Sequence, residues 1–203
     1  MGRIVLSDNV SLDGVIEDPA GDEGFERGGW VGLIKDRPEL SSLALREARD
    51  SSAMLMGRRT YEWFAARWPS REGELADLLN RKPKYVMSRT MTHVAWTCST
   101  RLTGDLLDEA ATLRRDLDGD IVVPASASIA RTLIEHDLVD EIRLKVFPIV
   151  LGAGERLFGP TTASKAFRLV DMATLDGDTT YLRYEARVGT DRPRRCTDEG
   201  ATR

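Results

Sequence analysis

The first pattern in this chain that could do chemistry is a glycine–arginine turn. An apolar run at residues 54–56 leads into Gly57, Arg58, Arg59 and Thr60. Glycine lets a ligand approach the backbone, and an arginine side chain can bind a phosphate through two parallel hydrogen bonds. We expect Thr60 to cap a helix whose N-terminus attracts anions. The alternative is a plain strand–turn–helix with solvated arginines.

Two further apolar runs end in small hydroxyl or cationic side chains. One run leads into Ser88 and Arg89, and another leads into Ser126 and Ser128. Ligands of open α/β sheets bind at the carboxyl ends of the strands, so these segments together indicate a phosphate-rich ligand. The second segment contains no glycine, and its Pro124 donates no amide hydrogen, so an ordinary loop is the competing interpretation.

A candidate for proton exchange is Asp13, which follows the first apolar run. It opens a loop rich in glycine and acidic residues that extends to about Gly32. Loops of this length often cover a binding site. Asp13 could be catalytic, or its carboxylate could stabilise the turn at Gly14, and the turn is the favoured interpretation. The histidines and the aromatic cluster Trp63, Phe64 and Trp68 give no comparable signal; we expect the aromatic rings in the core or at a subunit interface.

The elements that must position these residues alternate along the chain. Strand-like runs occupy residues 3–10, 53–57, 84–88, 120–123 and 141–150. Helix-length segments separate them, with apolar stripes at 105–117 and 128–136. This alternation predicts βαβ units and a mainly parallel sheet.

The last third of the chain predicts a change to antiparallel pairing. Residues 167–174 and 180–188 alternate in polarity around the turn-like segment 175–179, the pattern of a β-hairpin. In residues 141–147, Arg143 and Lys145 alternate with apolar neighbours, which predicts one buried face and one solvent-exposed face, or an edge strand. The expected fold class is therefore α/β with a mixed sheet.

Composition excludes several classes of function. The chain has 203 residues, 41% of them hydrophobic and 31% charged, with a formal net charge of -4, so no basic face suggests a nucleic-acid partner. No apolar run approaches the roughly 20 residues of a membrane span, and the N-terminus lacks signal-peptide features. Two distant cysteines indicate neither a disulfide framework nor a zinc site. We expect one soluble cytoplasmic domain over residues 1–188 and a disordered tail over 189–203.

Four segments, taken in order, resemble a known superfamily. They are SLDGVIEDPAG, MLMGRRTYEWFAARWP, PKYVMSRT and LIEHDLVDEIRLKVFPIVLGAGERLF. They resemble the dihydrofolate-reductase-like superfamily, most closely its branch with the C-terminal reductase domain of riboflavin-biosynthesis deaminase–reductases, over roughly residues 3–188. The resemblance implies a three-layer α/β fold with a mostly parallel sheet and an antiparallel C-terminal hairpin. It also implies NADPH as hydride donor, a small-molecule substrate and a homodimer.

The resemblance assigns cofactor contacts to two strand ends. Gly57, Arg58 and Thr60 match the family's G-R-x-T segment, which lines the adenosine-phosphate side of NADPH. Ser88 and Arg89 match the segment that contacts the 2′-phosphate.

Two other segments receive roles in the same way. Asp13 and Gly14 match the loop that borders the nicotinamide, and Asp13 is the candidate proton donor, with water as an equal alternative. The family's glycine-rich pyrophosphate turn corresponds to Ser126, Ala127, Ser128 and Ile129.

The chain departs from the family's pattern at the substrate. Ala125-Ser126 replaces a glycine pair, and Pro124 replaces the acidic substrate-binding residue of the riboflavin enzymes. Dihydrofolate reductases carry a carboxylate on the helix before the G-R-x-T strand, where this chain has Ser41, with Glu39 offset from that position. Neither the riboflavin pyrimidine nor dihydrofolate is therefore favoured.

Three functions remain open at this level. The first is an NADPH-dependent reductase of a small heterocyclic or imine-like substrate. The second is a non-catalytic dimeric ligand-binding protein on the same fold, suggested by Pro124 and the missing glycines. The third is a riboflavin-pathway reductase with another group in place of the lost acid.

Overall fold

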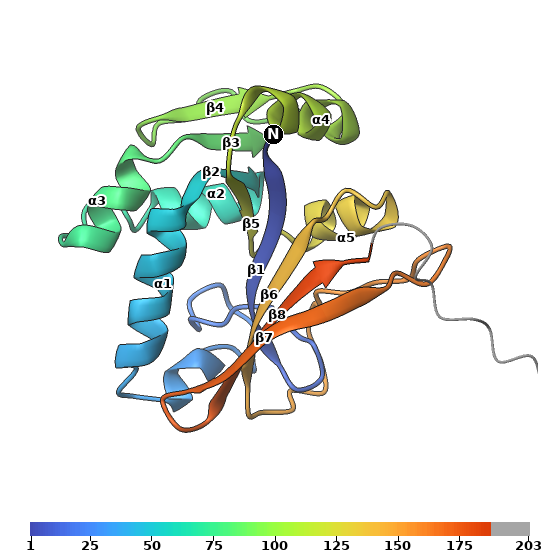
Figure 1. The fold of residues 1–203 in the computed structure, drawn as a ribbon. Coiled ribbons are helices and arrows are strands. Elements are labelled where there is room, and N and C mark those ends of the chain that lie inside the picture. The colour runs from blue at the N-terminus through green and yellow to red at the C-terminus, as the bar shows by residue number, and fades with distance from the viewer. Residues whose placement is uncertain (188–203) are drawn as a thin grey trace, which may run out of the picture.

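An eight-stranded sheet runs through the computed structural model, which describes residues 1–187 (Figure 1). The predicted tail lies outside the described residues. In chain order the strands are β1 (Arg3–Ser11), β2 (Ser51–Gly57), β3 (Lys84–Met87), β4 (Ser99–Leu102), β5 (Asp120–Pro124), β6 (Glu141–Phe147), β7 (Phe167–Leu175) and β8 (Thr179–Ala186). The helices are the 3₁₀ helix η1 (Trp30–Leu33), α1 (Pro38–Asp50), α2 (Arg58–Ala65), α3 (Glu74–Arg81), α4 (Leu106–Asp116) and α5 (Ala127–Glu135).

The strand order confirms the predicted mixed sheet. The strands lie in the order β4-β3-β2-β5-β1-β6-β8-β7, and all pairs from β4 to β6 are parallel. β8 pairs antiparallel with both β6 and β7, which forms the expected C-terminal hairpin. β4 was not predicted, because its partly exposed sequence Ser99–Leu102 carries no apolar run.

Helices cover both faces of the parallel part of the sheet. α4 and α5 pack on one face through a core that includes Ala110, Leu133 and Leu55. α1, α2 and α3 pack on the other face around Met56 and Tyr61. Because both faces are covered, the central strands read as continuous apolar runs rather than as an alternating pattern.

Two local predictions are corrected by the structure. α2 begins at Arg58 with Gly57 as its N-cap residue, so Thr60 lies inside the first turn and does not cap the helix. The Arg143–Phe147 face of β6 is also not solvent-exposed, since Arg143 and Phe147 are both buried. Arg143 binds Asp120 at 2.6 Å, which satisfies its charge inside the protein.

The long loop after β1 folds back against the sheet. Trp30, at the start of η1, packs edge-on against Phe147 with ring centroids 5.4 Å apart. Asp18 is buried, and its carboxylate accepts four backbone amides of the same loop. Among the described helices, none is both long and apolar enough to cross a membrane.

Candidate active site

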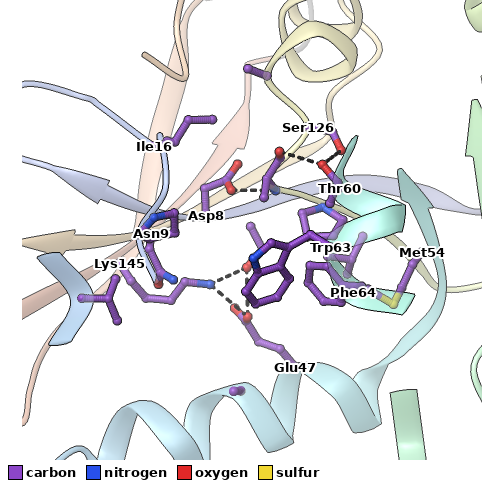
Figure 2. A pocket seen from close by; sticks show the side chains of 18 of the residues that line it. Asp8, Asn9, Ile16, Glu47, Met54, Thr60, Trp63, Phe64, Ser126 and Lys145 are labelled. Carbon is purple, nitrogen blue, oxygen red and sulfur yellow. Dashed lines mark hydrogen bonds and ion pairs between the residues drawn. The ribbon is translucent and has the colours of Figure 1, made fainter. Parts of the chain in front are cut away.

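A cavity of about 620 Å³ opens where β1, α1, α2 and the start of α5 meet the loop after β1. Figure 2 shows side chains from these elements turned toward one space. The sequence placed eleven residues at the site, and six of them line this cavity: Gly57, Arg58, Thr60, Ser126, Ala127 and Ser128.

Hydrogen bonds join the two predicted phosphate-binding turns to each other. The Gly57 amide donates to Ser126 Oγ at 3.1 Å, and Ser126 Oγ donates to Thr60 Oγ1 at 2.9 Å. Thr60 Oγ1 in turn donates to the Ala125 carbonyl at 2.9 Å. These bonds fix the N-terminus of α2 beside the N-terminus of α5, and the partial positive charge at each terminus favours an anion between them.

Two arginines stand at the rim of the cavity beside these turns. Arg58 pairs with Glu62 at 2.7 Å and donates to Thr90 Oγ1 at 3.1 Å, which links the ends of β2 and β3. Arg59 pairs with Glu23 at 2.8 Å. Both side chains are more than half exposed, so either can reorient toward a bound phosphate at small cost.

Five predicted residues lie outside the cavity lining. Ile129 is buried in the core next to Gly57. Ser88 ends the β3 segment, where its Oγ accepts the Met91 amide at 3.0 Å, and Arg89 beside it is exposed. The other two predicted residues outside the cavity lining are Asp13 and Gly14.

Asp13 occupies the turn position that the sequence favoured. Its carboxylate accepts the amides of Leu151 at 3.0 Å and Gly152 at 2.9 Å, and the Ser11 hydroxyl at 2.7 Å. These hydrogen bonds lower the pKa of Asp13 below its ordinary value, and the bond from the Leu151 amide has the largest effect. A carboxyl that has lost its proton at neutral pH is a poor acid, so the geometry supports the structural role.

The acid that sequence reasoning missed is Asp8, in the middle of β1. Its side chain is 4% exposed, and its Oδ1 accepts the Ala125 amide at 2.7 Å. Within residues 1–187, its Oδ2 has no hydrogen-bond partner. Burial raises the pKa of Asp8 to about 7, against the opposing charge of Lys145. A carboxylate between Leu6 and Val10 in a buried strand was the sequence signal for this residue.

Below Asp8, an ion pair crosses from β6 to α1. Lys145 Nζ lies 3.3 Å from Glu47 Oε2 and donates to Ser7 Oγ at 2.6 Å, and Ser7 Oγ donates to Glu47 Oε2 at 2.9 Å. Burial alone would raise the pKa of Glu47, but the charges of Lys145 and Arg143 outweigh it, and the pKa is lowered. The pKa values of two carboxyl groups of one cavity are thus shifted in opposite directions.

Helix α1 therefore does present a carboxylate to the site, although not at the position expected. Glu39 faces away, with its Oε2 accepting the Asp176 amide in the β7–β8 turn. Glu47 lies two turns further along α1, on the same stripe as the buried Leu43 and Ala48. An acid on the apolar stripe of an amphipathic helix was the signal that could have identified it.

The aromatic cluster of α2 also belongs to the site. Trp63, Phe64 and Trp68 all line the cavity, where only core or interface packing was expected. The Trp63 indole donates to Asp22 at 2.9 Å, and Arg67 stacks 4.3 Å above the Trp63 ring. The α2 aromatic rings therefore form one wall that the loop after β1 partly covers.

The turn between β5 and α5 is strained where the sequence lacks glycine. Ala125 has a φ of +45°, in the left-handed region that costs a residue with a Cβ about 1–2 kcal/mol. Both sides of its peptide are held, because the amide binds Asp8 and the carbonyl binds Thr60. Alanine therefore adopts here a left-handed backbone conformation that glycine would adopt at lower energy.

Comparison with known proteins gives one family match over most of the chain. The profile of the RibD C-terminal domain family matches residues 3–181. A protein from Bacillus subtilis (strain 168), the uncharacterized protein YyaP, is 29% identical over 187 residues, which cover 90% of this chain and 94% of that protein.

Solved structures share the fold. A Shewanella sp. PV-4 protein that carries a provisional riboflavin-biosynthesis name has a TM-score of 0.73 at 24% identity, covering 92% of this chain and 99% of that one. A pyrimidine reductase-like protein from Corynebacterium diphtheriae has a TM-score of 0.64 at 12% identity, covering 91% and 92%. Dihydrofolate reductase from Enterococcus faecalis, complexed with NADP(H), has a TM-score of 0.59 at 14% identity, covering 91% and 96%.

Proposed function

Since the chain belongs to the RibD C-terminal domain family, we propose that it is an NADPH-dependent reductase of a small heterocyclic or imine-like molecule. The family match and the reductase-like relatives support an oxidoreductase of the riboflavin-pathway or dihydrofolate reductase type. The choice of NADPH and the substrate class are our proposal.

One observation carries the cofactor assignment, namely the pair of helix N-termini joined through Ser126 and Thr60. The first amides of α2 and α5 have no partners within their own helices, so they can donate to phosphate oxygens. Arg58 and Arg59 add the cationic side chains that a 2′-phosphate requires. The residues present therefore fit a phosphorylated nicotinamide cofactor, which would supply a hydride when bound.

The remaining walls suit a planar substrate. Trp63 and Phe64 offer apolar faces for a ring, and Asp8 and Glu47 offer polar contacts in the same space (Figure 2). A few polar groups in a largely apolar cavity give orientation to a small ligand. Under this proposal the Glu47–Lys145 pair supplies polar substrate contacts in a site whose β5–α5 turn has Pro124 rather than an acid.

Titration with NADPH and NADH tests this function directly. We expect saturable NADPH binding in the micromolar range, followed by nicotinamide fluorescence and by thermal shift, and weaker NADH binding. The difference arises because Arg58 and Arg59 have no 2′-phosphate to bind in NADH. If NADPH does not bind at millimolar concentration, the reductase proposal fails.

A second candidate, a non-catalytic dimeric ligand-binding protein, is favoured by one contact. Asp8 Oδ1 already takes the Ala125 amide at 2.7 Å, so this amide is not free for a pyrophosphate. This candidate expects neither cofactor to bind. The same titration therefore separates the two functions.

A further inference from the structure

Asp8 is the one carboxyl group of the cavity with a buried oxygen that has no hydrogen-bond partner among residues 1–187. Leaving a buried polar atom without a partner costs about 1–3 kcal/mol, so native structures retain such atoms for a reason. In Figure 2 the Asp8 carboxyl group lies above Lys145 and beside the Thr60–Ser126 turn. Its Oδ1 accepts the Ala125 amide, whereas Oδ2 is buried and has no partner among the described residues.

Neutral carboxylic acid chemistry fits this oxygen better than carboxylate chemistry. The side chain is 4% exposed, and a buried carboxyl without enough partners retains its proton. Burial raises its pKa to about 7, although the positive charge of Lys145 opposes this. A protonated Oδ2 is a hydrogen-bond donor, so its partner must be an acceptor atom.

No charged group among the described residues donates a hydrogen bond to Asp8 Oδ2. Lys145 on β6 is already bound to Ser7 and Glu47, and Glu47 on α1 is an acceptor. The turn between β5 and α5 presents neutral side chains. From the loop after β1, Glu17 and Asp18 line the cavity and add only acceptors.

We propose that Asp8 binds the substrate by donating a hydrogen bond from Oδ2 to a ring nitrogen or carbonyl oxygen of a neutral heterocycle. Where that atom is the nitrogen of a C=N bond, Asp8 also supplies its proton during reduction. The carbon of the C=N bond accepts a hydride from the reduced nicotinamide cofactor, and the nitrogen accepts the proton from Oδ2. A C–H and an N–H bond form, the cofactor is oxidised, and the Asp8 carboxylate takes a proton from water. This reaction step rests on the proposed function, whereas the binding contact does not.

Binding of quinoxaline at two pH values tests the contact. Quinoxaline is a planar heterocycle with C=N bonds and stays neutral between about pH 6 and pH 8, so any pH dependence belongs to the protein. We expect binding, measured by quenching of tryptophan fluorescence, to weaken about tenfold from pH 6 to pH 8. This follows from the smaller protonated fraction of a carboxyl whose pKa is about 7.

Two variants at the same position separate a donor from a merely structural group. Asp8→Asn keeps an acceptor for the Ala125 amide and an N–H for the ligand, so quinoxaline should bind with equal affinity at both pH values. Asp8→Leu removes the donor, and binding should weaken at both. Circular dichroism establishes that each variant folds. Asp13→Asn is the matched comparison and should keep the wild-type pH dependence.

Three results would contradict the proposed contact, and a fourth would reassign it. Wild-type binding that does not change with pH, a pH dependence that survives in Asp8→Asn, or no quinoxaline binding at pH 6 would each overturn the inference. Loss of the pH dependence in Asp13→Asn instead would transfer the role to Asp13. NADPH titrated into the same samples tests the proposed function separately, since it can fail to bind while the quinoxaline contact persists.

Discussion

At the scale of single residues, the chemistry of the site depends on how burial and charge shift the pKa values of its ionisable groups. Burial raises the pKa of Asp8 to about 7, whereas the charges of Lys145 and Arg143 lower the pKa of Glu47, which pairs with Lys145. Each side chain is ordinary by itself. Their protonation states follow from the low-dielectric surroundings and from the distances between them.

Arg58 is predicted to discriminate between the two nicotinamide cofactors. We expect Arg58→Ala to weaken NADPH binding by about ten- to a hundredfold, the loss of one or two charge-assisted hydrogen bonds, and to affect NADH much less. Fluorescence titration of both cofactors measures this. Arg115→Ala, an exposed arginine on α4, is the control. An equal loss for NADPH and NADH would rule out contact with the 2′-phosphate.

Asp8 is also predicted to make stability depend on pH. An acid whose pKa rises on folding binds more protons in the folded state, so its contribution falls as the pH rises from the ordinary value to the folded value. For Asp8 this range runs from 3.8 to about 7. Asp8→Asn should therefore raise the free energy of unfolding above pH 7, by up to about 4 kcal/mol, and have little effect near pH 4.

Urea unfolding at several pH values checks this difference. Asp13→Asn provides a control of opposite sign, because the lowered pKa of Asp13 stabilises the protein at neutral pH and this contribution is lost on acidification. An Asp8→Asn difference that stays constant with pH would mean that the wild-type carboxyl is not protonated in the folded state.

At the scale of elements, two connections shape the cavity. The turn from β5 into α5 places its amides beside α2, and the loop after β1 lies across the α2 aromatic rings. Asp22 anchors that loop by accepting hydrogen bonds from Trp63 and Arg67. Exposed pairs of this kind are each worth only about 0.2–1 kcal/mol, so these contacts hold the loop weakly.

Relief of the strained turn is predicted to stabilise the protein. Ala125→Gly removes the cost of a left-handed φ but adds chain entropy to the unfolded state, so we expect a net gain of about 0.5–1 kcal/mol. Thermal unfolding measures it. Ala127→Gly, in the first turn of α5, is the control and should be destabilising by about the same amount. Destabilisation by both variants would contradict the strain argument.

Loss of the Asp22 anchor is predicted to loosen the loop. Asp22→Ala removes the bonds to Trp63 and Arg67, so a glutamyl endopeptidase should cleave at Glu23 or Glu26 severalfold faster. Asp36→Ala, another exposed acid between β1 and α1, should leave the rate unchanged. Similar rates for both variants would mean that other contacts hold the loop.

At the scale of the whole molecule, β7 is an edge of the sheet with exposed apolar side chains. Leu169 is 47% exposed and Met172 is 64% exposed. The register shift between Leu169 and Asp171 pairs Leu169 with Tyr184 and Met172 with Leu182, which puts both on one face. Exposed apolar edges are sites of association, and we propose that this one serves a homodimer.

Met172→Lys is therefore predicted to yield a monomer, because it places a charge in an apolar contact. Light scattering after size exclusion should give the mass of two chains for the wild type and of one chain for the variant. Leu33→Lys, a change at an equally exposed apolar residue of η1, should remain dimeric. A wild-type mass of one chain would remove the dimer proposal.

The order and type of most elements could be predicted from the sequence, because apolar periodicity is a local property. It predicted the strands that form the parallel core, the C-terminal hairpin, and the glycine–arginine turn at the end of β2. It missed β4, which is short and partly exposed, and the interior position of Lys84, whose ammonium donates to three backbone carbonyls.

Which ionisable groups share the cavity depends instead on how distant segments of the chain pack together. Asp8, Glu47 and Lys145 come from β1, α1 and β6, and no spacing along the chain relates them. Periodicity indicates the face on which a side chain lies, but not what covers that face. Burial by the surrounding elements raises the pKa of Asp8 against the opposing charge of Lys145, so the shift exists only when the elements pack together.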